Sequence, residues 1–197
     1  HRVDRRQRQM CIRDRWDTIS HASTDSKLLT YLEDIMKDVI DVRPWREGNG
    51  ISTRWTSVKW VNWIAKEFSH SAEHKKLPDW AFNAPEPFKK GLLAGFTLAE
   101  GSVKENSGVR IEVVNKLMLM QFKALFESFD AVCTLGPGKK AKGNNQATFV
   151  LYVANNTFKQ LNLPLPDCQK SEQFNAIKLT KSCLLYTSPS PRDRTRS

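Results

Sequence analysis

Apolar residues recur with a helical period in the first well-patterned segment of the chain. Leu28, Leu29, Leu32 and Ile35 follow the three-to-four-residue spacing of one helix face, which predicts an amphipathic helix over about 25–39. Ser, Thr and Asp side chains just before it are suitable N-caps. This segment therefore predicts the first helix of the protein.

The residues that follow this helix predict a β-hairpin and then a second helix. Strands are expected at 41–46 and 51–58, with Glu47-Gly48-Asn49-Gly50 as the turn between them. A short helix is expected over 60–68. The first half of the chain thus has the order helix, strand, strand, helix.

The second half of the chain repeats this order and places three further elements before it. Pro85 and Pro87 suit the first turn of a helix. The predicted elements are a helix over 86–99, a hairpin of 102–104 and 109–115, a helix over 116–131, strands at 132–135 and 147–154, and a helix that starts within 157–161. An order repeated after about 90 residues indicates an α+β protein built from two related units.

Both ends of the chain resemble translated adapter DNA. Residues 10–15 back-translate to ATG TGT ATA AGA GAC AGx and residues 183–188 to TGT CTC TTA TAC ACA TCT, and these strings are reverse complements over most of their length. Both resemble the ends of a transposon-based sequencing adapter. We therefore expect 1–15 and 182–197 to be disordered, adapter-derived sequence that plays no part in the fold, and we expect the natural protein to extend beyond both ends.

Excluding these ends changes the charge of the chain. The formal net charge is +10, of which six Arg and two Asp in 1–15 contribute +4, and three Arg and one Asp in 182–197 contribute +2. Residues 16–181 therefore carry +4, which is compatible with nucleic-acid binding but not diagnostic of it. Cys133 and Cys168 lack metal-ligand spacing, which favours a reducing, cytoplasmic compartment. No apolar run of about 18 residues predicts a membrane span.

The segment Leu93–Gly101, with the sequence LAGFTLAEG, is the most informative motif. Gly91, Gly95 and Ala99 share one helix face, and small residues at this spacing let two helices approach closely. The segment resembles the signature helix of the LAGLIDADG (dodecapeptide, DOD-type) homing endonucleases. The resemblance implies that two such helices cross at a pseudo-dyad and that each delivers its terminal acid, here Glu100, to the scissile phosphates.

Several positions of this motif depart from the family pattern. Thr97 and Leu98 stand where the family has Ile and Asp, and Glu100 stands where it has Asp. We expect neither Thr97 nor Leu98 to bind metal. Gly101 is expected to permit the sharp exit from the helix into a strand through its conformational freedom.

The block His74-Lys75-Lys76-Leu77-Pro78 resembles the segment before the second motif in intein-type members. There the first Lys is assigned a charge-stabilising catalytic role, which implies that role for Lys75, with Lys76 as the alternative. The resemblance also implies Mg²⁺ as the cofactor, held by Glu100 and by a partner acid from the first motif.

The element order of the second half matches the αββαββα repeat unit of this family. The first half resembles the same unit without its motif helix and first hairpin. We expect 16–76 to be the C-terminal part of the first repeat, 77–170 the second repeat and 171–181 a truncated extension. The complete protein is expected to be a pseudo-dimeric monomer, intein-encoded, with antiparallel sheets facing DNA, and this chain is expected to be inactive.

The partner implied by the resemblance is double-stranded DNA, bound by the polar side chains of the strands. Successive strand residues point to opposite faces; Arg can read guanine, whereas Lys mainly contacts phosphate. We expect contacts from Arg43, Arg46, Arg54, Lys104, Arg110, Glu112, Asn115, Lys139, Lys140 and Lys142. The last three lie in a Gly/Lys loop suited to backbone phosphate.

Two other functions are compatible with the sequence. A non-catalytic nucleic-acid binder on the same fold, such as an intron maturase or a DNA-binding regulator, would tolerate the departures in the motif. The pattern H-x-x-E-H at 70–74 would suit a zinc hydrolase if both His shared a helix face, but no third ligand is evident. Trp60 and Trp63 are expected to pack in the core or between helices rather than to stack on bases.

Overall fold

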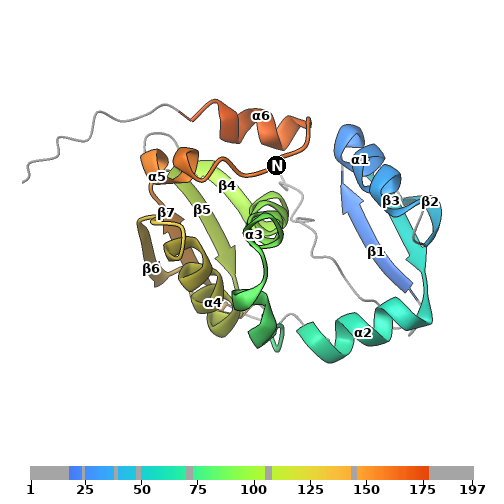
Figure 1. Cartoon of the computed structure of the whole chain (residues 1–197), viewed down its shortest axis with the longest axis horizontal. Helices are drawn as coiled ribbons and strands as arrows, with labels where there is room; N and C mark the ends of the chain where they lie inside the picture. Colours follow the sequence, from blue (N-terminus) through green and yellow to red (C-terminus); the bar gives the residue numbers. More distant parts are fainter. Residues whose placement is uncertain are drawn as a thin grey trace, which may run out of the picture.

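The structure is a computed structural model that describes residues 18–23, 25–37, 40–47, 50–69, 73–104, 108–142 and 146–177. Two antiparallel sheets with their own helices lie side by side in it, the N-terminal one on the right of Figure 1 and the C-terminal one on the left. The expected disordered ends, 1–15 and 182–197, lie outside the described residues. Among the helices described, none is long and apolar enough to cross a membrane.

The N-terminal unit is a three-stranded sheet with two helices. The sheet has the order β1-β3-β2, with both pairings antiparallel, and Arg43 of β2 lies opposite Arg54 of β3. Buried Ile40 and Val61 form a small core, against which Leu32, Met36 and Ile64 pack. The elements are β1 (Thr18–Ser23), α1 (Ser26–Met36), β2 (Asp41–Glu47), β3 (Gly50–Thr56) and α2 (Val58–Phe68).

The C-terminal unit is a four-stranded sheet in the order β4-β5-β7-β6, with all three pairings antiparallel. A 3-10 helix, η1, connects it to the N-terminal unit. The elements are η1 (Asp79–Asn83), α3 (Glu86–Glu100), β4 (Gly101–Lys104), β5 (Gly108–Val113), α4 (Lys116–Glu127), β6 (Cys133–Pro137), β7 (Phe149–Val153), α5 (Asn155–Gln160) and α6 (Gln169–Asn175).

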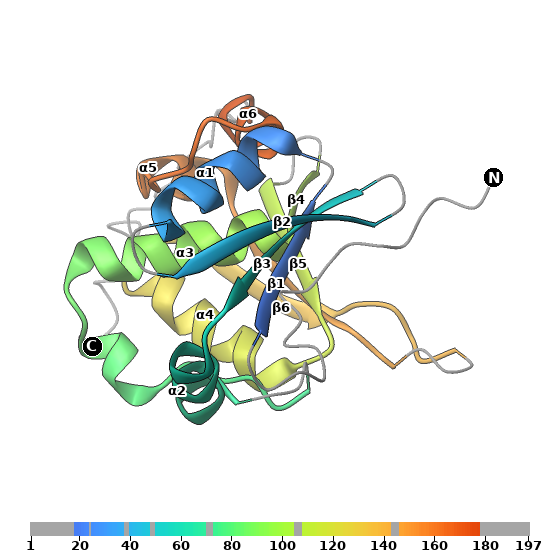
Figure 2. The ribbon, with the colours of Figure 1, turned by 90° about the vertical axis from the view of Figure 1, so that its right-hand side faces the viewer.

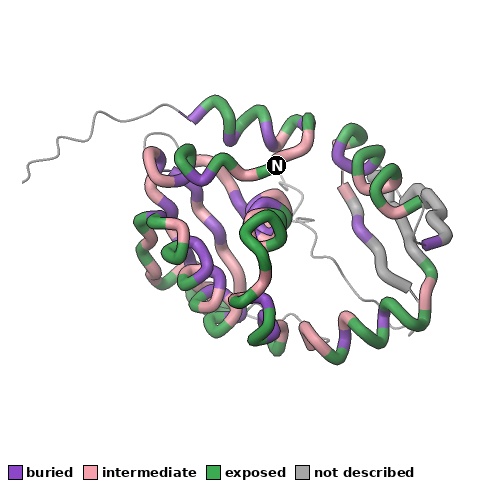
Figure 3. Tube along the Cα trace, viewed as in Figure 1, coloured by how far each residue is buried: buried purple, intermediate pink, exposed green. Residues whose placement is uncertain are grey.

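The main core lies between one face of this sheet and its helices, where Figure 3 shows the buried positions of strands and helices together. Alternate strand residues, Val109 and Ile111 among them, are fully buried because they face α3 and α4. Phe96 of α3 stacks on Phe122 of α4 at 3.6 Å between ring centroids. The intervening residues of β5, Arg110 and Glu112, lie on the opposite face of the sheet.

The two units have corresponding topologies, which confirms the repeat. The order β1-β3-β2 in the first sheet matches β5-β7-β6 in the second, with α1 and α4 at equivalent places in the chain. The expectation that the whole first hairpin is missing from the first unit is therefore wrong. One of its strands is present as β1, which the sequence did not reveal because TISHAS is short and only its pairing with β3 makes it a strand.

The other predicted elements are confirmed with shifts of a few residues at their ends, as is usual for helix and strand boundaries. The prediction omitted two short helices, η1 and α6. Both are too short to show a helical period in the sequence, and both are held by tertiary packing: Ala81 and Phe174 are buried. The turn at 48–49 and that at 105–107 lie outside the described residues.

A row of aromatic side chains connects α2 to the start of α3. Trp63 lies 5.4 Å from Trp60 and 6.3 Å from Trp80, which in turn lies 5.5 Å from Phe88, all between ring centroids. All four rings are exposed to solvent. Trp60 and Trp63 therefore lie outside the core, because α2 buries only Val61 and Ala65 fully. Trp63 packs between helices, against Trp80 of η1, which agrees with the other part of the expectation.

Candidate active site

Helix α3 has one buried face and one open face. Leu93 and Phe96 are buried against the sheet, whereas Gly91 and Gly95 are exposed. Apart from neighbouring residues of α3 itself, none of the described atoms lies within 4 Å of a Cβ added at either glycine. In Figure 1 the helix lies on the side of its sheet that faces the N-terminal unit, and Figure 2 shows the same elements from the side of that unit. The small-residue face predicted from the sequence is therefore open for a neighbouring helix to approach.

Gly101 ends this helix for a reason other than the one expected. Its φ of −77° is ordinary for any residue, so conformational freedom is not what it supplies. A Cβ at this position would lie 2.4 Å from the carbonyl oxygen of Thr97 and 3.2 Å from Cζ of Phe174. Glycine is required because the backbone of the last helical turn and the Phe174 ring leave no room for a side chain.

Glu100 is the last residue of α3 and is half-buried. Burial raises the pKa of its carboxyl above the ordinary value, and the positive charges of Lys75 and Lys170 offset that rise only in part. The C-terminal end of a helix also disfavours an anion. The protein alone therefore stabilises the ionised form of this carboxylate poorly. Acids in such surroundings are common at ligand-binding and catalytic sites.

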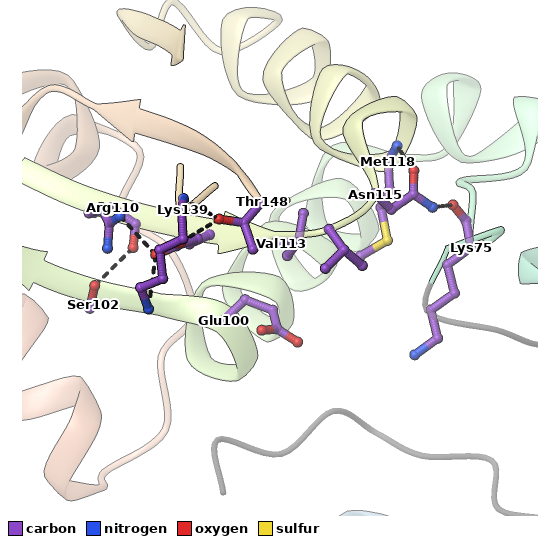
Figure 4. A pocket seen from close by; sticks show the side chains of 11 residues that line it. Lys75, Glu100, Ser102, Arg110, Val113, Asn115, Met118, Lys139 and Thr148 are labelled. Carbon is purple, nitrogen blue, oxygen red and sulfur yellow. Dashed lines mark hydrogen bonds and ion pairs between the residues drawn. The ribbon is translucent and has the colours of Figure 1, made fainter. Parts of the chain in front are cut away.

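A pocket of about 310 Å³ opens beside this carboxylate. In Figure 4 the side chains of Glu100, Lys75 and Lys139 point to the same side, with the two lysines flanking the acid. The described residues that line the pocket are Lys75, Glu100, Ser102, Arg110, Glu112, Val113, Val114, Asn115, Met118, Lys139 and Thr148. Six residues expected to act on metal or DNA therefore meet in one place.

Lys75 is held at the pocket by the N-terminus of α4. The Asn115 side chain donates from Nδ2 to the Lys75 carbonyl oxygen at 2.6 Å, and its Oδ1 accepts from the Met118 amide at 3.0 Å as the N-cap of the helix. One turn further along, Gln121 accepts from the Leu77 amide at 2.8 Å and donates to the Leu77 carbonyl at 3.0 Å. Asn115, expected to contact DNA, is thus buried and occupied by structural hydrogen bonds.

Glu112 is the centre of a polar network on the open face of the sheet. Its carboxylate accepts from the Thr148 hydroxyl and from the Lys139 amide, and it lies 2.8 Å from Nη2 of Arg110 and 3.8 Å from Nζ of Lys139. Burial opposes ionisation, but the Thr148 hydroxyl and the two cations together lower the pKa of this carboxyl. Glu112 therefore orients Arg110 and anchors the loop between β6 and β7.

The structure does not bring every predicted residue to this pocket. Lys76 is exposed, and its backbone amide bonds to the Phe68 carbonyl at 3.1 Å. Lys140 and Lys142 are exposed along the loop that follows β6. The side chains of Arg43, Arg46, Arg54 and Lys104 lie outside what the structure describes, although their strands are placed.

The sequence did not predict Thr148 and Ser102 as residues of this pocket, nor did it predict the role of Lys170 of α6 beside it. Its ammonium donates to the carbonyl oxygens of Leu98 at 2.6 Å and Ala99 at 3.3 Å. Burial lowers the pKa of this lysine, an effect that Glu100 partly opposes. No local signal marks it, because Lys170 and Leu98 are 72 residues apart in the chain.

The zinc-hydrolase hypothesis receives no support from the structure. Helix α2 ends at Phe68, and Glu73 and His74 lie in a turn, so the helix face that the pattern requires is not formed by them; His70 lies outside the described residues. Within the described part of the chain, no three His, Cys, Asp or Glu residues are grouped so that they could hold a metal ion.

No protein-family model matches the chain, and no curated protein matches its sequence significantly. Solved structures of homing endonucleases are similar to it. Mesophilic variants of I-DmoI give a TM-score of 0.56 at 13% identity over 75% of this chain and 79% of that one. I-DmoI with DNA and Mn gives 0.55 at 14% identity over 75% and 80%. I-WcaI bound to its DNA recognition sequence gives 0.53 at 11% identity over 87% and 80%.

These similarities establish the fold. The chain has the α+β fold of the LAGLIDADG homing endonucleases, with an antiparallel four-stranded sheet and the helices that accompany it. At identities of 11–14%, the similarity extends to architecture alone, and function must be argued from the residues of this chain.

Proposed function

We propose that this chain is part of a site-specific double-strand DNA endonuclease of the homing type, which hydrolyses phosphodiester bonds with Mg²⁺. The observation that carries the proposal is the Glu100 carboxylate at the end of α3, in a pocket that also holds Lys75, Arg110 and Lys139. Three cationic side chains against the two acids Glu100 and Glu112 leave this pocket positive, which suits a phosphate group.

Glu100 offers a carboxylate oxygen, which is the type of ligand that Mg²⁺ prefers, but it is a single protein ligand. Mg²⁺ is commonly held by one or two carboxylates together with phosphate oxygens and water. Glu112 is committed to Arg110, Lys139 and Thr148, so Glu100 remains as the acid of this pocket able to hold the ion. When bound, the ion polarises the phosphate and lowers the pKa of a coordinated water. We expect the partner acid to come from a second motif helix beyond the described residues.

The other residues of the pocket have roles that follow from their charge and position. Lys75, held in place by Asn115, offsets negative charge that develops on the phosphate during the reaction. Arg110 and Lys139, which both contact the Glu112 carboxylate, bind the DNA backbone beside the cleavage point. These tasks need a fixed geometry, which the hydrogen bonds from α4 and from Glu112 provide.

The remaining features fit a two-repeat protein that works as a pseudo-dimer. The open face of Gly91 and Gly95 accommodates a second motif helix, and the paired strands of both sheets present alternate residues to the DNA. The block from Lys75 to Pro78 supports an intein-encoded member. Because Glu100 is the one acid of its pocket able to hold the ion, the chain by itself is expected to bind DNA without cleaving it.

Cleavage by the chain extended upstream of Trp16, into the region expected to encode the second motif helix, tests the proposal. A randomised double-stranded DNA library should contain a long site that is cut only with Mg²⁺ or Mn²⁺. Glu100→Gln should abolish cleavage, whereas Glu127→Gln, which alters an exposed acid at the end of α4, should leave it unchanged.

Two outcomes would redirect the assignment. Full cleavage by the Glu100→Gln variant would overturn the role of this acid. Salt-sensitive binding of structured RNA, without cleavage of any DNA in the library, would favour a non-catalytic binder such as an intron maturase.

A further inference from the structure

Helix α6 is attached to the end of the motif helix through one side chain. The last carbonyl groups of an α-helix have no partner within the helix. In α3, Leu98 and Ala99 carry two of them, and both accept from the Lys170 ammonium, at 2.6 and 3.3 Å. A cation at a helix C-terminus also interacts favourably with the helix dipole. Lys170 therefore caps α3 from another element of the fold.

The helix that carries Lys170 is itself firmly placed. Phe174 is fully buried in the main core, with its ring 5.9 Å from that of Phe158. Ser171 is buried, and its hydroxyl lies 3.0 Å from Sγ of Cys168. The Phe174 ring also borders the space that Gly101 must leave empty. Lys170 thus projects from a rigid support onto the last turn of α3, as the position of α6 beside β4 allows.

The partial desolvation of the Lys170 ammonium at the end of α3 indicates a role beyond packing. The Lys170 side chain is half-buried, and an ammonium group partly withdrawn from water must replace lost hydration with hydrogen bonds. An uncharged side chain could fill the same space without that cost. The bonds fix the two residues immediately before Glu100. Any rotation or unwinding of this turn would move the Glu100 carboxylate relative to Lys75 and Arg110 across the pocket.

We propose that Lys170 is a positioning residue that locks the last turn of α3 and thereby aims the Glu100 carboxylate at the metal and phosphate of the active site. The inference deepens the proposed endonuclease function and rests on it for the identity of the metal. It makes α6 part of the active-site scaffold and extends the functional unit beyond 170, where the sequence predicted only a truncated extension.

The test uses the full chain with Lys170→Met, which keeps the length of the side chain and removes its charge and donors. Lys170→Arg is the conservative variant. Lys159→Met is the matched control, because Lys159 is an exposed lysine in the last turn of α5. One measurement is amide hydrogen exchange at Gly101, whose N–H bonds to the Thr97 carbonyl. The other is Mn²⁺ affinity, from paramagnetic broadening of the Gly101 and Ser102 amide signals.

Lys170→Met should accelerate exchange at Gly101 by about tenfold relative to β5 and β7 amides. It should also weaken Mn²⁺ binding by about 10-fold or more, as loss of a residue that supports a metal ligand typically does. Lys170→Arg should restore most of the protection from exchange at Gly101 and most of the Mn²⁺ affinity. Lys159→Met should change neither quantity. If Lys170→Met does not fold, Lys170→Gln replaces it with the same expectations.

Three results separate the possible failures. Wild-type exchange at Gly101 in Lys170→Met would overturn the proposal. Exchange accelerated equally throughout the sheet, without recovery in Lys170→Arg, would reduce Lys170 to a general stability role and also overturn it. If Mn²⁺ fails to broaden these signals even in the wild-type chain, the metal role of Glu100 fails, while a selective exchange effect would still support the positioning role.

Discussion

Replacement of Asn115 by alanine distinguishes the structural role of this residue from the DNA contact that its sequence position predicted. Asn115 is buried, and its side chain makes two hydrogen bonds, from Met118 N to its Oδ1 and from its Nδ2 to the Lys75 carbonyl. Alanine removes both. The variant should therefore destabilise the fold and release the segment that carries Lys75.

The expected loss of stability has two parts, one for each hydrogen bond of the Asn115 side chain. Removal of a side-chain N-cap costs about 1 kcal/mol. Loss of the bond to the Lys75 carbonyl, which then lacks this partner, costs about 1 kcal/mol more. A total of about 2 kcal/mol corresponds to a fall in Tm of about 4–8 °C for a chain of this size. Asn115→Ser keeps a capping oxygen but cannot reach Lys75, so it should lose about half as much.

Urea unfolding at pH 7 measures these differences. Ser128→Ala serves as the control, because the Ser128 hydroxyl donates only to the Leu125 carbonyl, three residues away, at the other end of α4. It should cost less than about 1 kcal/mol. A loss below about 0.5 kcal/mol for Asn115→Ala, accompanied by weaker DNA binding, would refute the anchoring role and restore the DNA contact.

Three further predictions concern the end of α3 and the half-buried thiol of Cys133. Gly101→Ala should destabilise the fold by about 1–3 kcal/mol, because its Cβ would meet the Thr97 carbonyl at 2.4 Å; Gly95→Ala, with open space around it, should be neutral or stabilising. Glu100→Gln should raise Tm at pH 7.5 but not at pH 4. Cys133 should be alkylated very slowly at pH 8 in the folded protein, because burial, followed by the charge of Glu127, raises the pKa of its thiol to about 12.

The pH dependence of the Glu100 prediction follows from the direction in which its pKa moves on folding. Since burial raises the pKa of this carboxyl above 4.5, the folded protein binds the proton more readily than the unfolded chain. Stability is therefore lost as pH rises from the ordinary pKa through the folded one, by about 1.4 kcal/mol for each pH unit that separates the two pKa values. Glu100→Gln avoids this loss because glutamine does not ionise. A gain in Tm at pH 4 equal to the gain at pH 7.5 would contradict the explanation.

The remaining two predictions have equally direct checks. Equal unfolding free energies for Gly101→Ala and Gly95→Ala would contradict the conclusion that steric crowding excludes a side chain at Gly101. Peptide-resolved mass spectrometry measures alkylation of Cys133, with the urea-unfolded chain as the control. Equal rates in the two states would contradict a thiol whose pKa is raised by the fold.

The local pattern of the sequence was sufficient for most of the fold. Helical periodicity located α1 and α4, and capping residues marked the start of α1, where Asp25 is the N-cap, because these signals act within a few residues. The motif helix and its acid were recognised in the same way. Gly101 was identified as the end of that helix, although the reason lies in crowding by Thr97 and Phe174 rather than in its own conformation.

Contacts between distant residues were decided by the tertiary structure alone. Strand β1 becomes a strand only by pairing with β3, and Lys170 reaches the end of α3 from 72 residues away. The sequence placed Glu112 and Asn115 among the DNA contacts because both are polar and near strands. The fold instead uses Glu112 to orient Arg110, and Asn115 to hold Lys75. A side chain's type shows which bonds it can make, but only the packed chain determines which partners lie within reach.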